Sequence, residues 1–181
     1  MKEHTMFEVL DVGCGANPTG TVNCDLFPGD SEHRLKSLIP KDMPNFILCD
    51  AQHLPFRDNS FETVFSKYAL EHVGQKPQAT NQGPFYMLKE MVRVSKRTID
   101  VRVPHRFSLA NSEKRFWLRR HNAFFNLRWF ERVIPKIEKR LNVKLSVLAD
   151  VVYKPIIVWF VAMPDEIRVT LIKRNPSKCD A

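Results

Sequence analysis

The sequence predicts an α/β fold of the doubly wound type, in which helices cover a mostly parallel sheet. Two observations carry this prediction. A short apolar strand over residues 9–12 runs directly into a turn that contains Gly13 and Gly15. Two further short apolar segments each end in a carboxylate, at Asp25 and Asp50. In such folds the ligand lies beyond the carboxyl ends of the strands, where a glycine lets the backbone turn sharply.

Apolar periodicity predicts the individual elements. Strands are expected at 9–12, 21–24, 46–49, 61–65 and 98–103, followed by a sheet pair at 143–152 and 156–162. Residues 167–172 are expected to add a terminal strand or helix. Helices are expected at 32–39, 68–73, 85–95, 108–120 and 126–140, with a flexible loop at 74–84. Pro135 lies inside the last helix and is expected to kink or restart it.

Carboxylates beside the glycine turn indicate the kind of ligand. Asp11 precedes the turn and can hold a cationic or hydrogen-bonding group. Asp25 suits a ribose diol, since a carboxylate accepts hydrogen bonds from both hydroxyls, and Asp50 suits an adenine amino group. Solvated loop acids would explain one such residue more readily than three. Pro18 stands where a dinucleotide fingerprint requires its third glycine, which disfavours a nicotinamide dehydrogenase, so an adenosine-type ligand is expected.

Three motifs occur in the order VLDVGCG (residues 9–15), CDAQHLPFRDNSFETV (49–64) and ALEHV (69–73). Together they resemble class I S-adenosylmethionine-dependent methyltransferases of the type 11 branch, over roughly residues 9–105. The resemblance implies a three-layer, Rossmann-like methyltransferase fold with a mostly parallel seven-stranded sheet. The chain departs from the family between Pro18 and Val22, where the first helix is expected to be shortened or absent.

The resemblance also implies S-adenosyl-L-methionine as the cofactor. The glycine turn would approach the methionine end, Asp25 the ribose, and Asp50 and Ala51 the adenine, with Ser66 near the cofactor after the fourth strand. Residues and resemblance together assign cofactor binding to Asp11, Gly13, Cys14, Gly15, Asp25, Leu26, Asp50, Ala51 and Ser66.

Length and composition predict a single globular domain over residues 1–181. Its cofactor-binding half is expected at 9–105, and lid helices and terminal strands on the substrate side at 106–181. The four cysteines show no C-x-x-C spacing, so reduced thiols are expected and a metal site is not. The longest apolar run, 156–163, is too short to cross a bilayer, and no apolar leader precedes the first strand. A cytoplasmic protein without membrane association is therefore expected.

The positive charge of the chain is concentrated in one region. Residues 89–144 hold 16 Lys and Arg against 5 Asp and Glu, whereas the rest of the chain holds 12 against 15. Within 106–129, basic residues alternate with six aromatic residues, a composition that suits stacking on nucleic acid. An amphipathic lid with buried aromatics explains the same pattern and is favoured. Region 106–144 is thus a candidate surface for nucleic acid or another polyanion.

No catalytic triad is recognisable, and methyl transfer does not need one, because placing the acceptor in line with the methyl group supplies much of the rate. His72 and His105 are candidate bases, although each is as readily a packing or contact residue. Tyr68 could present an aromatic face to a sulfonium, or pack in the core. The expected function is methyl transfer by direct in-line displacement to an unidentified acceptor. The alternative is a non-catalytic nucleic-acid-binding module on the same fold.

Overall fold

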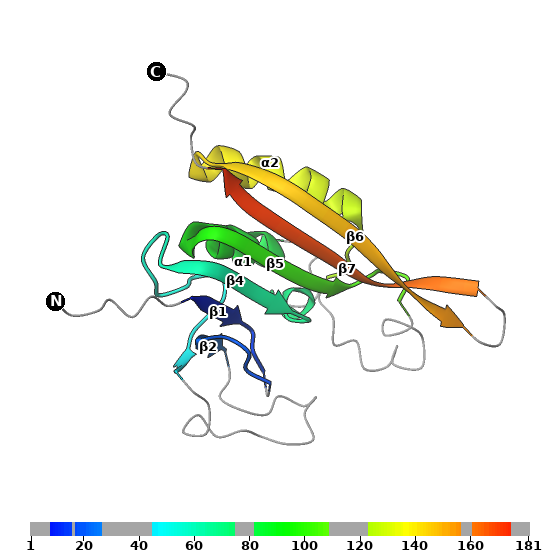
Figure 1. Ribbon diagram of the computed structural model, residues 1–181, viewed down its shortest axis with the longest axis horizontal. Coiled ribbons are helices and arrows are strands. Elements are labelled where there is room, and N and C mark those ends of the chain that lie inside the picture. Colours follow the sequence, from blue (N-terminus) through cyan, green and yellow to red (C-terminus); the bar gives the residue numbers. More distant parts are fainter. Residues whose placement is uncertain are drawn as a thin grey trace.

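The computed structural model describes residues 8–15, 17–26, 45–74, 82–108, 123–156 and 161–174. These residues form one seven-stranded sheet with the strand order β3-β2-β1-β4-β5-β7-β6 (Figure 1). Strand β7 is antiparallel to both of its neighbours, and the other pairs are parallel. The predicted α/β fold with a mostly parallel seven-stranded sheet is confirmed.

The parallel part of the sheet consists of β1 (Val9–Val12), β2 (Val22–Asp25), β3 (Phe46–Leu48), β4 (Phe61–Lys67) and β5 (Ser95–Pro104). Its central strands are apolar and buried on both faces, as parallel strands are in α/β folds. Leu10, Val12, Val64, Val101 and Val103 are inaccessible to solvent. Because these strands are parallel, the residues that follow them gather at one edge of the sheet.

Helix α1 (Gln82–Val94) connects β4 to β5 and begins three residues before the predicted start. Pro84 lies in its first turn, where the missing N–H has no helical partner to lose. Met87, Leu88, Met91 and Val92 form its buried face. The helix packs against β4 and β5 and also contacts α2, so the two described helices lie on the same side of the sheet.

Helix α2 (Leu127–Leu141) has defined ends. The Asn126 side chain accepts a hydrogen bond from the Trp129 N–H at 3.1 Å and caps the amino end. At the other end Asn142 adopts a left-handed conformation with φ 50°. The helix runs through Pro135 without ending or restarting, contrary to the prediction of a restart. Pro135 is exposed, so the carbonyl that loses its partner can be solvated.

Strands β6 (Lys144–Ile156) and β7 (Val161–Arg174) form a long antiparallel hairpin that extends past the rest of the sheet (Figure 1). The prediction of separate segments at 156–162 and 167–172 was wrong, because β7 continues through Pro164. Pairing of β7 with β5 begins only at Glu166. Pro164 therefore needs no hydrogen-bond partner on that side, and it lies beside the register shift in β6 after Val152.

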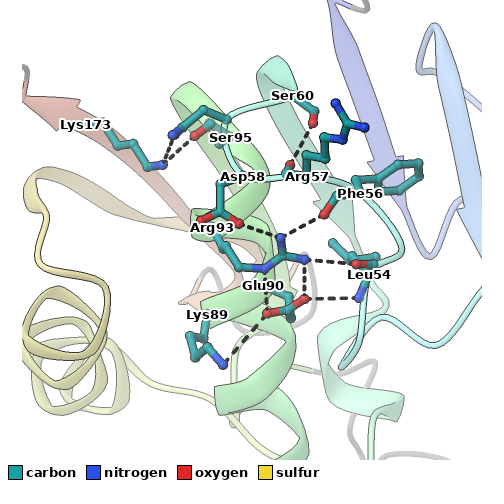
Figure 2. A network of polar contacts seen from close by, with 11 residues as sticks. Leu54, Phe56, Arg57, Asp58, Ser60, Lys89, Glu90, Arg93, Ser95 and Lys173 are labelled. Carbon is teal, nitrogen blue, oxygen red and sulfur yellow. Dashed lines mark hydrogen bonds and ion pairs between the residues drawn. The ribbon is translucent and has the colours of Figure 1, made fainter.

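The segment between β3 and β4 has no helix and is held by polar contacts. Arg93 of α1 donates from Nη2 to the Leu54 carbonyl at 2.9 Å, and from Nη1 to the Phe56 carbonyl at 2.8 Å and to Asp58 at 2.7 Å (Figure 2). The buried carboxylate of Glu90 accepts from Arg93 and from the Leu54 N–H. The network fixes the segment that leads away from Asp50.

The described residues between β1 and β2, 13–15 and 17–21, form turns and bends without a helix. After β4 the predicted helix 68–73 is reduced to the short 3-10 helix η2 (Leu70–His72). The predicted helices 32–39 and 108–120 lie outside the described residues. No helix in the described part of the chain combines the length and apolarity needed to span a bilayer.

Candidate functional site

The turn after β1 is built from two glycines in the left-handed region, Gly13 with φ +73° and Gly15 with φ +60°. The N–H groups of Gly13 and Cys14 both donate to the Cys24 carbonyl, at 2.8 and 3.1 Å, which ties the turn to the end of β2. A Cβ on Gly13 would lie 2.3 Å from the Cβ of Ala69. The turn therefore packs directly against the residues that follow β4, and only glycine fits there.

Asp25 closes the turn from the end of β2. Its Oδ2 accepts a hydrogen bond from the Gly15 N–H at 2.9 Å. The carboxylate therefore lies beside the glycine turn and is partly exposed, which is compatible with the predicted contact to a ribose. Leu26 follows directly and is 53% exposed, which leaves an apolar side chain beside the carboxylate for a ligand to cover.

Asp50 lies after β3 at the same edge. Its Oδ1 accepts from the Gln52 N–H at 2.8 Å, which fixes the short turn that contains Ala51. A hydrogen bond from the Cys24 thiol lowers the pKa of Cys49, while burial and the nearby charges of Asp25 and Asp50 oppose this shift. Because β2 and β3 are parallel and the Cys49 N–H donates to the Asp25 carbonyl at 3.0 Å, Asp25 and Asp50 lie at the same end of the sheet.

Asp11 is the member of the predicted site that faces inward. It is 2% exposed, and its Oδ2 accepts from both the N–H and the hydroxyl of Thr19, at 3.0 and 2.7 Å. Burial raises the pKa of Asp11, and its hydrogen bonds with Thr19 oppose that shift. In this structure the carboxylate holds the β1–β2 connection and is not accessible from outside.

Two further members are also buried. Cys14 is 8% exposed, and its thiol lies 3.7 Å from the Gly15 carbonyl. Ser66 is 1% exposed, and its Oγ has no hydrogen-bond partner. Cys14, Cys24 and Cys49 are not joined in disulfide bonds. Among the described residues, no three His, Cys, Asp or Glu side chains gather to hold a metal ion.

The aromatic and basic candidates lie on the other side of β4 from the glycine turn. The Tyr68 hydroxyl donates a short hydrogen bond to Glu166 on β7, and the Lys67 ammonium lies over the Tyr68 ring. Since β7 is two strands beyond β4, away from β1, Tyr68 does not present its ring to the turn. The His105 Nδ1 accepts from the Phe107 N–H at 3.2 Å, and burial with the nearby Arg106 charge lowers its pKa.

The structure reveals one residue that was not proposed from the sequence. Glu71 of η2 is 1% exposed, and neither carboxylate oxygen has a hydrogen-bond partner. Burial raises its pKa to about 8. Glu71 is visible in the ALEHV motif, between Leu70 and His72. Its burial could not be predicted, because no apolar pattern shows that the second position of a 3-10 turn is buried.

The basic region, residues 106–144, contributes some side chains to the core and others to the surface. Phe125 and Trp129 are buried, whereas Phe107 and Phe124 are more than half exposed. The charged side chains of α2 lie on its exposed face. The buried pair fits the favoured lid interpretation for this part of the region, and residues 109–122 lie outside the described residues.

Residues 10–98 match the family model of a methyltransferase domain. This part of the chain belongs to the methyltransferase family. A SAM-dependent methyltransferase from Archaeoglobus fulgidus superposes with a TM-score of 0.61 at 15% identity, covering 94% of this chain and 87% of that one. The YcgJ protein of Bacillus subtilis superposes with a TM-score of 0.59 at 13% identity, covering 93% and 92%. The methyltransferase domain therefore lies within a chain whose whole fold is that of these proteins.

A curated relative of the methyltransferase domain carries a different activity in its name. The mouse protein Arginine-hydroxylase NDUFAF5, mitochondrial, is 38% identical over 88 residues, which are 44% of this chain and 25% of that protein. The rat protein of the same name is 39% identical over the same length. The chain thus spans about a quarter of the length of the curated relatives it matches.

S-adenosylmethionine is the cofactor that this methyltransferase domain implies, and the residues fit it. Gly13 offers a turn that a side chain would block, Asp25 offers an acceptor for the ribose hydroxyls, and Asp50 and Ala51 lie at the same edge. The fit involves the partly exposed members of the predicted site, whereas Asp11 and Ser66 are buried.

Proposed function

We propose that this protein is an S-adenosylmethionine-dependent methyltransferase. The observation that carries the proposal is the hydrogen bond from the Gly15 N–H to Asp25. It brings together the glycine turn and the acid proposed to bind the ribose, and Asp50 lies nearby. A methyltransferase domain at residues 10–98 supports it. The acceptor is not specified by the fold, since one fold hosts many substrates.

The chain's own residues supply binding and orientation. Asp25 holds the ribose, the Asp50 turn borders the adenine, and the Gly13 turn lets the donor approach the residues after β4. When bound, S-adenosylmethionine supplies a methyl group on a sulfonium leaving group, which an acceptor displaces directly and in line. Alignment and exclusion of water at such a site contribute much of the rate acceleration.

Calorimetric titration tests the proposal. The wild-type protein should bind both S-adenosylmethionine and its demethylated product, and Asp25→Ala should weaken both at least tenfold. Asp58→Ala is the matched control, because Asp58 is a mostly exposed carboxylate at the other end of β4. The proposal fails if the wild type binds neither compound, or if Asp25→Ala binds as well as the wild type.

Arginine hydroxylation is a second candidate, favoured by the 38% identity with a protein of that name over part of the chain. Mass spectrometry of an arginine-containing peptide separates the two, after incubation with S-adenosylmethionine in one sample and with dioxygen and a two-electron reductant in another, since hydroxylation takes one oxygen atom from dioxygen and releases the other as water. Methyl transfer adds the mass of one CH₂ group, whereas hydroxylation adds the mass of one oxygen atom. Loss of either product in Asp25→Ala ties it to this site.

A non-catalytic nucleic-acid-binding module remains the alternative for the basic region. Exposed basic side chains on α2 support it, including Arg128, Arg132, Lys136 and Lys139. The test is the binding of single-stranded RNA at two salt concentrations, because phosphate contacts give a steep salt dependence. Salt-dependent binding without any affinity for S-adenosylmethionine would favour the module over the enzyme.

A further inference from the structure

Glu71 lies in η2, next to the glycine turn that follows β1. Ala69, two residues before it, packs against Gly13 so closely that no Cβ fits between them. The glycine turn and η2 are therefore direct neighbours at the carboxyl edge of the sheet. On its other side the Glu71 carbonyl accepts from the Ala123 N–H at 3.1 Å, which ties η2 to the segment leading into α2. Glu71 thus lies between the donor-binding turn and the substrate side of the chain.

Among the residues that the structure describes, the Glu71 carboxyl has no hydrogen-bonded partner that would balance its charge when it ionises. Its carboxylate is buried, and neither oxygen accepts a hydrogen bond. Within the described part of the chain, the one basic group within 4.0 Å is the His72 ring, with Nε2 at 4.0 Å from Oε1, which is too long for a hydrogen bond. A buried carboxyl without partners is costly and is normally paired or hydrogen-bonded. Both carboxylate oxygens of Glu71 are therefore buried without a hydrogen-bond partner among the described residues.

The acids on β7 differ from Glu71 in having side-chain partners. Glu166 is bound by Arg168 and by Tyr68, and Asp165 is bound by Lys154 and Ser108. The charge of Glu71 is felt at Tyr68, where it adds to the rise in the pKa of that hydroxyl, which burial chiefly causes. These acids are satisfied inside the protein, whereas Glu71 is not. The unsatisfied acid is the one beside the donor-binding turn.

We propose that Glu71 binds the methyl acceptor through a positively charged nitrogen group, an ammonium or a guanidinium. A carboxylate with two open oxygens accepts two parallel N–H donors from a guanidinium, or one strong charge-assisted bond from an ammonium. Pairing would stabilise the ionised form of Glu71 against the cost of burial and place a nitrogen next to the donor site. This inference rests on the proposed function, because the nitrogen is placed relative to the S-adenosylmethionine site.

Either a protein side chain or a small free amine could present such a group. The experiment uses protein saturated with S-adenosylhomocysteine and titrates capped arginine and capped lysine, as models of side chains, and agmatine and cadaverine, as free amines. Capped citrulline and capped norleucine are the neutral counterparts. We expect at least one cationic compound to bind ten times or more tightly than its neutral counterpart. The source that binds more tightly identifies the acceptor class.

Two variants test whether the Glu71 carboxyl causes the preference for cationic compounds. Glu71→Gln should remove the preference for the cation, whereas Glu62→Gln, at a half-exposed acid on β4 paired with Lys96, should retain it. Titration in two buffers of different ionisation enthalpy gives a second readout. Since Glu71 is largely protonated at neutral pH without a partner, cation binding should release a proton in the wild type and not in Glu71→Gln. Among the described residues, the other titratable groups near this carboxyl are His72 and Tyr68, so His72→Gln should keep the release.

Three outcomes would overturn the inference. One is equal binding of cationic and neutral compounds by the wild type. Another is an undiminished cation preference in Glu71→Gln. The third is a loss of affinity for S-adenosylhomocysteine itself in Glu71→Gln, which would assign the carboxyl to the cofactor. Failure of the wild type to bind S-adenosylhomocysteine would instead count against the proposed function, so the two failures are distinguishable.

Discussion

Gly13 and Ala69 are in van der Waals contact across the gap between the first and fourth strands, and a methyl group on Gly13 would lie 2.3 Å from that of Ala69. The contact joins the two loops on which the proposed donor and acceptor sites are built. A change in one loop must therefore be transmitted to the other.

Gly13→Ala is expected to weaken S-adenosylmethionine binding at least tenfold and to destabilise the fold. The new side chain meets both a positive φ, which costs about 1–2 kcal/mol, and the Ala69 methyl group. Calorimetry and urea unfolding measure the two effects. Gly74→Ala is the matched control, since Gly74 has φ +106° but no atom within 3.4 Å of a new Cβ. Equal losses in the two variants would show that the Ala69 contact is unimportant, whereas recovery in Gly13→Ala/Ala69→Gly would confirm it.

The stability of the free protein is expected to depend on the ionisation of Glu71. Burial raises its pKa from 4.5 to about 8, so between these values the folded state holds a proton that the unfolded state has lost. The stabilisation is therefore complete below about pH 4.5 and is lost as the pH rises toward 8. In this window the free energy of unfolding should fall by about 1.4 kcal/mol per pH unit.

Urea unfolding of the wild type and of Glu71→Gln at several pH values between 4.5 and 8 measures this slope. The variant cannot ionise at this position, so the difference in stability between the two proteins should grow in its favour as the pH rises. Parallel pH profiles for the two proteins would contradict the assignment of a raised pKa to Glu71.

Arg93 is expected to be among the most sensitive polar residues of the fold. Arg93→Met leaves the buried Glu90 carboxylate, 7% exposed, with only the more distant Lys89 ammonium at 3.8 Å as a charge partner among the described residues, and frees the carbonyls of Leu54 and Phe56. Breaking such a pair from one side costs about 3–5 kcal/mol. Hydrogen bonds with Glu90 and Asp58 raise the pKa of Arg93, so its charge persists at every accessible pH.

A double-mutant cycle separates the pair from its surroundings. Arg93→Met/Glu90→Gln should be less destabilised than the sum of the single variants, as measured by urea unfolding. Lys96→Met is the control, because its pair with Glu62 is partly exposed and should contribute less than about 1 kcal/mol. An additive cycle would mean that the two residues act independently.

The end of α2 provides a prediction about backbone conformation. Asn142 has φ 50° and caps the helix in the left-handed region. Asn142→Gly should stabilise the protein by up to about 1 kcal/mol, because glycine adopts this conformation without strain. Asn142→Val should destabilise it by about 1–2 kcal/mol. Thermal unfolding of the two variants gives the order, and a more stable valine variant would contradict the strain argument.

Local patterns in the sequence were sufficient to predict the strands in the parallel half of the sheet. The strands at Val9–Val12 and Val22–Asp25 are short, apolar and followed by glycine or acid, so their ends could be assigned almost to the residue. The hairpin was harder, because Pro164 suggests a break in any strand. It is tolerated only because β7 extends past the end of β5, and that is a property of the whole sheet.

The layout of the candidate site was predictable where residue type and spacing alone indicate it, as for Asp25 beside Gly15. It was not predictable where burial decides the role. Asp11 and Asp25 are both acids at strand ends, yet one faces Thr19 inside the protein and the other faces the edge. Glu71 likewise looks like an ordinary polar residue of a turn, and only three-dimensional packing removes it from water.

The direct connection between β1 and β2 also bears on how the chain folds. Leu10 pairs with Val22, only 12 positions away in sequence, whereas it pairs with Val64 on its other side, 54 positions away. Closing the shorter loop costs less chain entropy, so we expect the first parallel pair to form early and to act as a template for β4. Refolding kinetics of Val22→Ala would show this as slower folding at nearly unchanged unfolding rate.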